Sequence, residues 1–308
     1  RQMCIRDRFR RVSPAAGSRA SSRSVTTSRQ RMSNEKNSVI APTFDEWRRG
    51  KAGLTRLECD LLLSHVTHMS RSQIVARANR RLNCAQLSQL ETLGRALSEG
   101  TPLAYLLGEK EFFGLSFDVN PAVLVPRPET ELLVELAIER IEPGTQLLDA
   151  GTGSGAIAVA IARAQPKIQI DACDTSTSAL NVARANAQKH RVQINFYESN
   201  WFANFHDHKW HMIVSNPPYI AAEDPHLAAL AAEPRLALVA ANKGLAALTQ
   251  IIEQSPNFLH QPGWLLLEHG YDQAASVRRL MTQRGFVEVK SMTDLGGIER
   301  VTMGQWHG

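Results

Sequence analysis

From residue 146 to the end of the chain, short apolar runs alternate with amphipathic stretches, and this alternation constrains the fold more than any other feature. The runs have the length of strands, and the stretches between them have helical spacing. Strands that alternate with helices form a mostly parallel sheet in an α/β domain. Strands are expected near residues 146–150, 168–173, 192–197, 211–215, 264–268 and 286–291.

The last apolar run, residues 300–306, follows a Gly296-Gly297 turn, and no helix separates it from the run before it. A parallel neighbour needs a long crossover, whereas a short turn joins antiparallel strands. The last strand is therefore expected to insert antiparallel into the sheet.

Three segments precede or begin this domain. Residues 41–108 carry leucines at three- and four-residue spacing, which predicts a small helical bundle for packing or substrate docking. Residues 109–126 are expected to form a hairpin linker, in which Asn120-Pro121 breaks the apolar run. Residues 127–308 then form the α/β domain, whose first helix starts at Glu129 or Thr130. The apolar positions expected to face inward are Leu57, Leu61, Leu62, Val66, Ile74, Ala78, Leu82, Leu87, Leu90, Leu93 and Leu97 in the bundle, and Leu132, Leu133, Leu136 and Ala137 in that first helix.

The positive charge of the chain is concentrated in residues 1–40. The formal net charge is +5, yet this segment holds ten Lys and Arg and only two acids, so the remainder is slightly acidic. Stable nucleic-acid binding is therefore not expected. The segment is predicted to be a disordered tail. Its Arg- and Ser-rich composition also fits a mitochondrial transit peptide, and the alternative is sequence upstream of a true start at Met32.

The cysteines and histidines indicate neither a disulfide framework nor a metal site. The four cysteines include no C-x-x-C pair, which favours a reducing compartment. His206, His208 and His211 lack the spacing of a zinc helix, so a solvated loop is expected and no metal. No apolar run approaches the roughly 18 residues of a membrane-spanning helix. A cytoplasmic protein is expected, or a mitochondrial one if residues 1–40 are a transit peptide.

A glycine-rich loop joins the first strand of the α/β domain to a helix. Its residues are Gly151, Thr152, Gly153, Ser154 and Gly155. Glycines allow a tight turn and close approach of a ligand, while the following helix offers free N–H groups. The same residues also occur in purely structural turns.

Asp174 follows the second strand, nineteen residues after Gly155. This placement suits a carboxylate that accepts both ribose hydroxyls of an adenosyl group. Capping of the helix expected at 176–189 is the alternative. The G-x-G-x-G spacing of the loop differs from the G-x-G-x-x-G of dinucleotide-binding dehydrogenases and resembles that of class I methyltransferases.

Four residues suited to hold a planar nitrogen group, Asn216, Pro217, Pro218 and Tyr219, follow the strand at 211–215. An amide or aromatic amino nitrogen is a poor nucleophile because its lone pair is delocalised, so an enzyme must orient the group. The Asn216 carbonyl and a backbone carbonyl held by the Pro-Pro step supply two acceptors, and Tyr219 can lie against the plane. A rigid turn is the alternative. In a doubly wound sheet the first and fourth strands lie side by side, so this motif and the glycine loop should face one crevice.

With these motifs in view, residues 44–308 resemble the release-factor glutamine methyltransferases. The most specific segments are 124–131, 151–155, 215–220, 223–227, 265–270 and 299–301. The resemblance implies a Rossmann-like class I methyltransferase sheet with an N-terminal helical domain and a hairpin linker. It also implies methyl transfer from S-adenosylmethionine, with S-adenosylhomocysteine as product, to the side-chain N5 of the glutamine in the Gly-Gly-Gln motif of class 1 peptide chain release factors, which modulates translation termination.

The resemblance also assigns roles to site residues. The loop from Gly151 to Gly155 would wrap the methionine part of the cofactor, Asp174 would bind the ribose, and Trp201 would lie on the adenine side. Residues 216–219 would hold the glutamine amide. Without the resemblance, the aromatic neighbours of Trp201 would favour a place for it in the core.

Two departures from the family pattern stand out. The family usually has Asp before the Trp, in contact with the adenine amino group, where this chain has Asn200. An Asn carbonyl still accepts a hydrogen bond but carries no charge, so modestly weaker cofactor binding is expected. The stretch from Ala228 to Pro234, which is expected near the substrate mouth, is shorter and richer in Ala than usual, and this leaves the details of release-factor docking open.

Other functions share parts of this pattern. Glutamine methyltransferases of a ribosomal protein, adenine-N6 DNA methyltransferases and guanine-N2 ribosomal RNA methyltransferases carry the same Asn-Pro-Pro-Tyr motif. A non-catalytic scaffold of the same fold is a further alternative. The slightly acidic body disfavours the nucleic-acid enzymes, the Pro128-Glu129-Thr130 sequence disfavours the ribosomal-protein enzyme, and the intact motif disfavours the scaffold. A monomer is expected.

Overall fold

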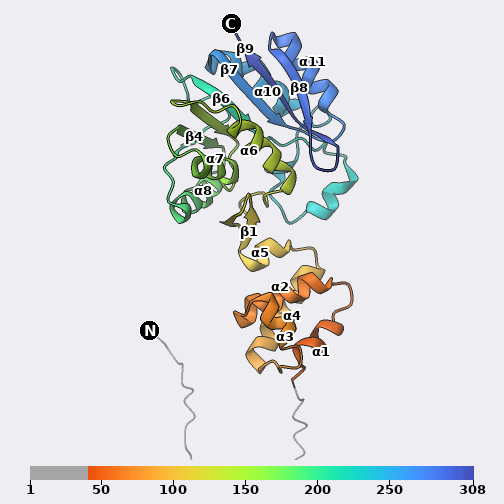
Figure 1. Ribbon diagram of the computed structural model, residues 1–308. Coiled ribbons are helices and arrows are strands. Elements are labelled where there is room, and N and C mark those ends of the chain that lie inside the picture. The colour runs from red at the N-terminus through yellow and green to blue at the C-terminus, as the bar shows by residue number, and fades with distance from the viewer. Residues whose placement is uncertain (1–40) are drawn as a thin grey trace, which may run out of the picture. The chain divides into compact units, whose positions relative to one another are not determined.

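The computed structural model describes residues 41–308, so the tail and transit-peptide predictions for residues 1–40 lie outside the described residues. The chain runs first through helices and a hairpin and then through an α/β sheet (Figure 1). The helices are α1 (Phe44–Arg49), α2 (Arg56–Thr67), α3 (Arg71–Ala76), α4 (Cys84–Ser98), α5 (Leu103–Leu107), α6 (Glu131–Ile138), α7 (Ala156–Ala164), α8 (Thr177–His190), α9 (Arg235–Leu238), α10 (Ala246–Gln254) and α11 (Ala274–Arg284). The strands are β1 (Glu109–Phe112), β2 (Leu115–Asp118), β3 (Gln146–Ala150), β4 (Gln169–Asp174), β5 (Asn195–Glu198), β6 (Trp210–Ser215), β7 (Leu259–Glu268), β8 (Val287–Thr293) and β9 (Glu299–Trp306).

Local sequence explains where the first four helices start. Each begins with a capping box, in which the residue before the helix and the third helical residue satisfy each other's backbone N–H groups. In α2, for example, the Thr55 side chain accepts from the Glu58 backbone and the Glu58 side chain accepts from the Thr55 backbone. Short helices of this kind depend on such caps and on packing, because isolated helices of their length are marginal.

The inward face of α2 differs in part from the expected one. Leu57 is exposed, whereas Cys59, Leu62, Leu63 and Val66 are buried. These four positions follow the i, i+3, i+4, i+7 spacing of one helical face, and Leu57 lies outside that stripe. In α6 the same kind of shift buries Val134 in place of the half-buried Leu132.

The hairpin before the α/β sheet occupies residues 109–118, within the range expected for it. β1 and β2 pair antiparallel, from Glu109 opposite Asp118 to Phe112 opposite Leu115. The turn residues Phe113 and Gly114 both have positive φ, as a two-residue hairpin turn requires. Residues 119–126, the rest of the expected linker, form no strand and lead to α6.

The sheet has seven strands in the order β5-β4-β3-β6-β7-β9-β8. Strands β3 to β7 pair in parallel, and β9 is antiparallel to both of its neighbours. The predicted α/β sheet with an antiparallel last strand is therefore confirmed. The strand order reverses between β3 and β6, which places the topological switch point there.

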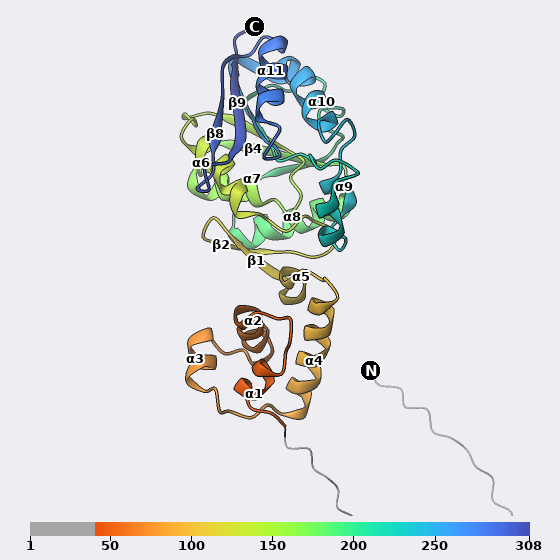
Figure 2. The same ribbon diagram turned by 90° about the vertical axis from the view of Figure 1, so that its right-hand side faces the viewer.

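Helices cover both faces of the sheet (Figures 1 and 2). Alternate residues of one strand point to opposite faces, so Leu147 and Met212 pack in the cluster with α6, α7 and α8, whereas Leu148 and Ile213 pack with α10 and α11. Both faces are buried, which is why these strands read as continuous apolar runs. None of the helices in residues 41–308 has the length and apolar character needed to cross a bilayer.

β7 begins five residues before the expected strand and includes Pro262 and Gly263. Those residues usually break a strand, but the pairing of β6 with β7 is irregular between Trp210 and Met212. A bulge accommodates a proline because the ladder skips its missing N–H. The sequence pattern alone does not report such an irregularity.

Candidate active site

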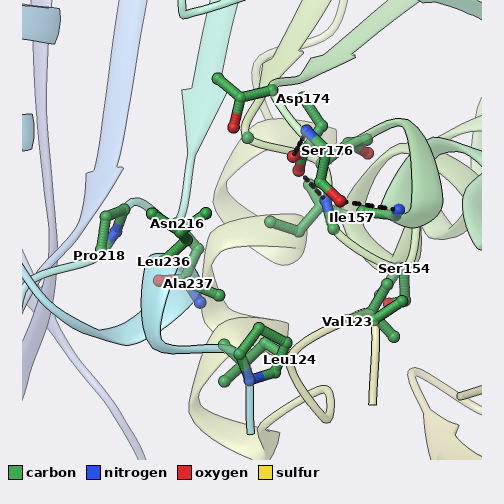
Figure 3. A pocket seen from close by; sticks show the side chains of 18 of the residues that line it. Val123, Leu124, Ser154, Ile157, Asp174, Ser176, Asn216, Pro218, Leu236 and Ala237 are labelled. Atoms are coloured by element: carbon green, nitrogen blue, oxygen red, sulfur yellow. Dashed lines mark hydrogen bonds between the residues drawn. The ribbon is translucent and has the colours of Figure 1, made fainter. Parts of the chain in front are cut away.

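One cavity lies at the carboxyl ends of the central strands, and both predicted motifs contribute to its wall. Figure 3 shows Asn216 and Pro218 on one side of it and Asp174 and Ser176 on the other. The parent strands β3 and β6 are direct neighbours, and the Ser215 hydroxyl donates to the Ala150 carbonyl at 2.6 Å. The two motifs therefore meet at adjacent strand ends.

The glycine loop lines the cavity with Gly151, Thr152, Gly153 and Ser154. A Cβ added to Gly151 would come within 3.1 Å of the Trp201 ring, so only glycine lets the ring lie against the loop. Gly155 does not reach the cavity wall and packs against α8.

Asp149 anchors this loop from beneath. Its buried carboxylate accepts the Thr152 hydroxyl at 2.6 Å and the Ala158 backbone N–H at 3.3 Å. Burial raises the pKa of Asp149 to about 7, and these two hydrogen bonds act in the opposite direction. The loop is thus tied to β3 and α7 through a single side chain.

Asp174, at the end of β4, lies on the wall of the cavity. Its Oδ2 accepts the Gly153 N–H and its Oδ1 accepts the Ser176 N–H, each at 2.9 Å. Burial raises the pKa of Asp174, while these backbone hydrogen bonds oppose that change. The N-cap of α8 is Ser176, whose side chain accepts from Ala179, so Asp174 is not the helix cap. Each carboxylate oxygen keeps a lone pair for a ligand hydroxyl.

Trp201 belongs both to the core and to the cavity wall, the two places considered for it. The side chain is half-buried, packs against the core cluster of α10 and α11, and also lines the cavity beside Gly151. Asn200 is exposed and lies outside the cavity wall, although its neighbours Ser199 and Trp201 both belong to that wall. A ligand that extends past Trp201 toward solvent would meet Asn200 at the rim.

Asn216 lines the cavity with a defined orientation of its carboxamide. Its Nδ2 donates to the Thr130 hydroxyl oxygen at 3.1 Å. Within residues 41–308, no hydrogen-bond donor reaches Asn216 Oδ1. The carbonyl end of this side chain is therefore available to a ligand.

Pro217 and Tyr219 lie away from the cavity wall, and Pro218 belongs to it. Pro217 is buried, and the Tyr219 hydroxyl donates to Glu268 Oε1 at 3.3 Å. Burial and the neighbouring Glu268 carboxylate raise the pKa of Tyr219, so this phenol remains protonated and a donor. The Tyr219 backbone carbonyl accepts from Gln273 Nε2 at 3.0 Å, which fixes the path of the motif.

Gly244 packs directly against the backbone of Tyr219, and replacing Gly244 with Ala should distort the Asn-Pro-Pro-Tyr motif. A Cβ at Gly244 would stand 2.0 Å from the Tyr219 carbonyl oxygen, and the residue has φ +83°. We expect Gly244→Ala to destabilise the fold by about 2–4 kcal/mol and to lower activity, because the backbone of Tyr219 must move. Urea denaturation and initial rates measure the two effects.

Gly144→Ala is the matched control for that variant. Gly144 has φ +85°, but nothing lies within 4 Å of its added Cβ. It should therefore lose about 1 kcal/mol from backbone strain alone and keep full activity. Equal losses of stability and activity in the two variants would show that the close contact between Gly244 and Tyr219 does not matter.

Two stretches of the cavity wall lie outside the two motifs. One is the segment before α6, and the other lies at α9, where the exposed Leu236 lies at the cavity (Figure 3). The buried Glu233 side chain holds the two together, because it pairs with Arg127 and accepts the Val125 N–H at 3.1 Å. The stretch ending at Pro234 was expected near the substrate mouth, but its contact with the segment before α6 was not predicted, because the two are more than a hundred residues apart along the chain. The residues concerned are Ala122, Val123, Leu124, Pro126, Arg127, Thr130, Pro234, Leu236 and Ala237.

The histidines considered as metal ligands are separate from this cavity. His208 packs against Phe205 and Trp210, and His211 Nδ1 accepts the Gln146 N–H at 3.1 Å. Over the described range 41–308, no group of three or more His, Cys, Asp or Glu side chains is arranged to hold a metal ion.

Comparison with known proteins gives matches along most of the chain. Residues 128–289 match the family described as "Methyltransferase small domain", and residues 49–108 match "PrmC N-terminal domain". A release factor glutamine methyltransferase of Burkholderia pseudomallei is 46% identical over 266 residues, which cover 83% of this chain and 93% of the relative. The enzyme of that name from Escherichia coli is 43% identical over 256 residues, 82% of this chain and 92% of the relative.

Among solved structures, a methyltransferase from Pyrococcus furiosus has the same fold, with a TM-score of 0.51 and 14% identity over 73% of this chain and 100% of its own. The two curated relatives are matched over more than nine-tenths of their length, so the likeness includes the helical region as well as the sheet. The chain therefore belongs to the release factor glutamine methyltransferase family.

Proposed function

We propose that this protein transfers the methyl group of S-adenosylmethionine to the side-chain N5 of the glutamine in the Gly-Gly-Gln motif of class 1 release factors. The observation that supports this most directly is the position of Asn216, which lines the same cavity as the glycine loop and Asp174 and whose Oδ1 accepts no hydrogen bond among the described residues. A carboxamide acceptor beside a nucleoside-binding carboxylate is the arrangement that methylation of an amide requires.

The wall of the cavity fits an adenosyl donor. Gly153 lies at the wall with open space around its Cα, so a ligand can approach the loop backbone closely. Asp174 supplies an anionic acceptor for ribose hydroxyls, and the Trp201 ring supplies a flat apolar surface for a purine. We assign Gly151, Thr152, Gly153, Ser154, Asp174 and Trp201 to this donor, and Gly155 to the turn that leads the loop into α7.

The substrate amide would be held by the residues that follow β6. Asn216 Oδ1 and a backbone carbonyl of the Pro-Pro step accept the two N–H bonds of the NH₂ group, so its plane is fixed and its lone pair points at the donor. The donor supplies an electrophilic methyl group on a positively charged sulfur. As the N–C bond forms, the C–S bond breaks, its electron pair stays on sulfur, and the nitrogen releases one proton to water.

Transfer of label tests this proposal. The protein is incubated with S-adenosylmethionine labelled in its methyl group and, in separate reactions, with a bacterial class 1 release factor, ribosomal protein, DNA or ribosomal RNA. We expect label on the glutamine of Gly-Gly-Gln only, located by mass spectrometry. A release factor whose motif reads Gly-Gly-Ala should take up no label, and label in the nucleic acids would contradict the proposal.

The Asn200 position gives a second test, which concerns the donor alone. We expect Asn200→Asp to bind S-adenosylmethionine about two- to fivefold more tightly, because a charged acceptor forms the stronger hydrogen bond to an amino group. Calorimetry measures the change. Asn257→Asp, at an exposed position that does not line the cavity, is the control and should leave the affinity unaltered. Unchanged or weaker binding in Asn200→Asp would remove this residue from the donor site.

The location and partners follow from this activity. We place the protein in the cytoplasm, where release factors act on ribosomes, and we expect a monomer that contacts its protein substrate through the helical region. The mitochondrial alternative depends on residues 1–40, which lie outside the described residues.

A further inference from the structure

Two buried side chains beside the site have no role in the assignment above. Thr130 is 4% exposed and Glu268 is 1% exposed. Thr130 stands at the start of α6, where a threonine normally caps the helix, yet its side chain makes no capping hydrogen bond. Its oxygen instead accepts the Asn216 Nδ2–H at 3.1 Å.

Glu268 lies at the end of β7. Its Oε1 accepts the Tyr219 hydroxyl at 3.3 Å, and its buried Oε2 has no close partner among the described residues. The Thr130 hydroxyl lies near enough to lower the pKa of this carboxyl. The carboxylate therefore has spare acceptor capacity on the side of Thr130.

The direction of these hydrogen bonds follows from the chemistry of the groups. An ionised carboxylate only accepts, so it attracts the single proton of the Thr130 hydroxyl. The lone pairs of that hydroxyl then face Asn216 and can only accept from it. As a result the NH₂ end of the Asn216 carboxamide turns toward Thr130, and the carbonyl end turns toward the cavity.

We propose that Thr130 and Glu268 are positioning residues that set which end of the Asn216 carboxamide faces the substrate. This inference rests on the proposed function, because the orientation matters only if Asn216 must accept from an NH₂ group. In the reversed orientation, the Asn216 NH₂ group would face the substrate NH₂ group. Two donors would then oppose each other, and the reacting nitrogen would lose the contact that orients it.

Thr130→Val tests the first link, because valine keeps the shape of threonine and removes only the hydroxyl. We expect kcat for release-factor methylation to fall about 10–100-fold, as expected for a misplaced reacting group, with KM for the release factor changed less than about threefold. Thr130→Ser restores the hydroxyl and should return kcat to within about threefold of the wild type. Equal impairment in the Val and Ser variants would overturn the proposal.

Thr145→Val is the matched control for a lost buried hydroxyl. Thr145 is also buried, and its hydroxyl bonds the Glu142 backbone at the opposite end of β3. It should lose stability comparably to Thr130→Val, as judged by thermal unfolding, and retain wild-type kcat. A matching loss of kcat in the control would attribute the effect to stability.

Glu268→Gln tests the second link. Glutamine can still accept from Tyr219, but its NH₂ group can donate to Thr130 and so allow the reversed arrangement. Burial raises the pKa of Glu268 to about 7, opposed by Thr130, Tyr219 and Arg300, whereas Glu129 raises it further. Protonated Glu268 can donate in the same way. We expect wild-type kcat to fall as the pH drops below about 7, and kcat of Glu268→Gln to be about tenfold lower at pH 8 and to lack this limb. A full pH limb in the variant would contradict the role of Glu268.

A spectroscopic measurement separates this inference from the proposed function. The side-chain NH₂ signals of Asn216 in the ¹⁵N-labelled full-length protein are identified by their loss in Asn216→Ala. We expect these signals to shift in Thr130→Val and Glu268→Gln and to move with pH near 7 in the wild type. If the signals shift in this way while no release factor is methylated, the proposed function is wrong, but the positioning of Asn216 by Thr130 and Glu268 is supported. If release factors are methylated but the signals do not shift in either variant, the positioning role of Thr130 and Glu268 is refuted.

Discussion

Asn216→Ala is expected to lower kcat for release-factor methylation about 10²–10³-fold, the loss found when a group that stabilises a transition state is removed. The substitution deletes the acceptor oxygen that faces the cavity, so the substrate NH₂ group keeps only a backbone partner. The affinity for S-adenosylmethionine should change less than about threefold, because the donor contacts come from the glycine loop and Asp174. Single-turnover kinetics and calorimetry measure the two quantities.

The control for this variant is Asn181→Ala. Asn181 lies exposed on α8, and its only side-chain hydrogen bond among the described residues is a weak one from Arg184 at 3.4 Å. It should retain wild-type kcat. Full turnover in Asn216→Ala would take Asn216 out of the mechanism, and with it the orientation proposed for Thr130 and Glu268.

Asp174→Ala is expected to weaken S-adenosylmethionine binding roughly 100-fold or more. Hydrogen bonds to a charged group each contribute about 1.5–3 kcal/mol, and every 1.4 kcal/mol changes the affinity about tenfold. The variant also frees the N–H groups of Gly153 and Ser176, so the loop should lose order before the donor binds. Calorimetry at several donor concentrations gives the dissociation constant, and thermal unfolding without donor reports the loss of order.

Asp171→Asn provides the comparison on the same strand. Asp171 also lies on β4, but it accepts from Trp210 Nε1 at 2.8 Å and from Asn195 at 2.9 Å and does not line the cavity. This variant should lose stability and keep the affinity for the donor. If both variants bind S-adenosylmethionine as the wild type does, the ribose role of Asp174 is wrong.

The order and type of the main elements could be predicted because they depend on local pattern. Apolar runs such as 211–215 report burial on both faces of a sheet, and the Gly296-Gly297 turn without a helix predicts the antiparallel last strand. The adjacency of β3 and β6 in the sheet could be predicted because alternating strands and helices wind outward from a switch point. These inferences needed no knowledge of distant contacts.

Details that depend on exact geometry were predicted less well. The buried face of α2 was predicted to include Leu57, but the structure buries Leu63 instead. The two leucines are equally apolar, so the sequence does not distinguish them. The hairpin lies within the predicted range, but its turn at Phe113-Gly114 was not identified, because this pair is a less obvious turn signal than Asn120-Pro121. In both cases the packing partner decides between similar local patterns.

The amino-acid sequence by itself determined the α/β sheet and the identity of the two motifs, since periodicity and short-range spacing are properties of neighbouring residues. The resemblance of its motifs to known proteins indicated the family. Only the tertiary structure decided that Thr130 bonds Asn216, that Tyr219 turns to Glu268, and that Glu233 holds two segments at the cavity. These contacts join residues 49 to 108 positions apart. A hydrogen bond depends on the distance and angle between two groups in space, and the spacing of residues along the sequence specifies neither quantity.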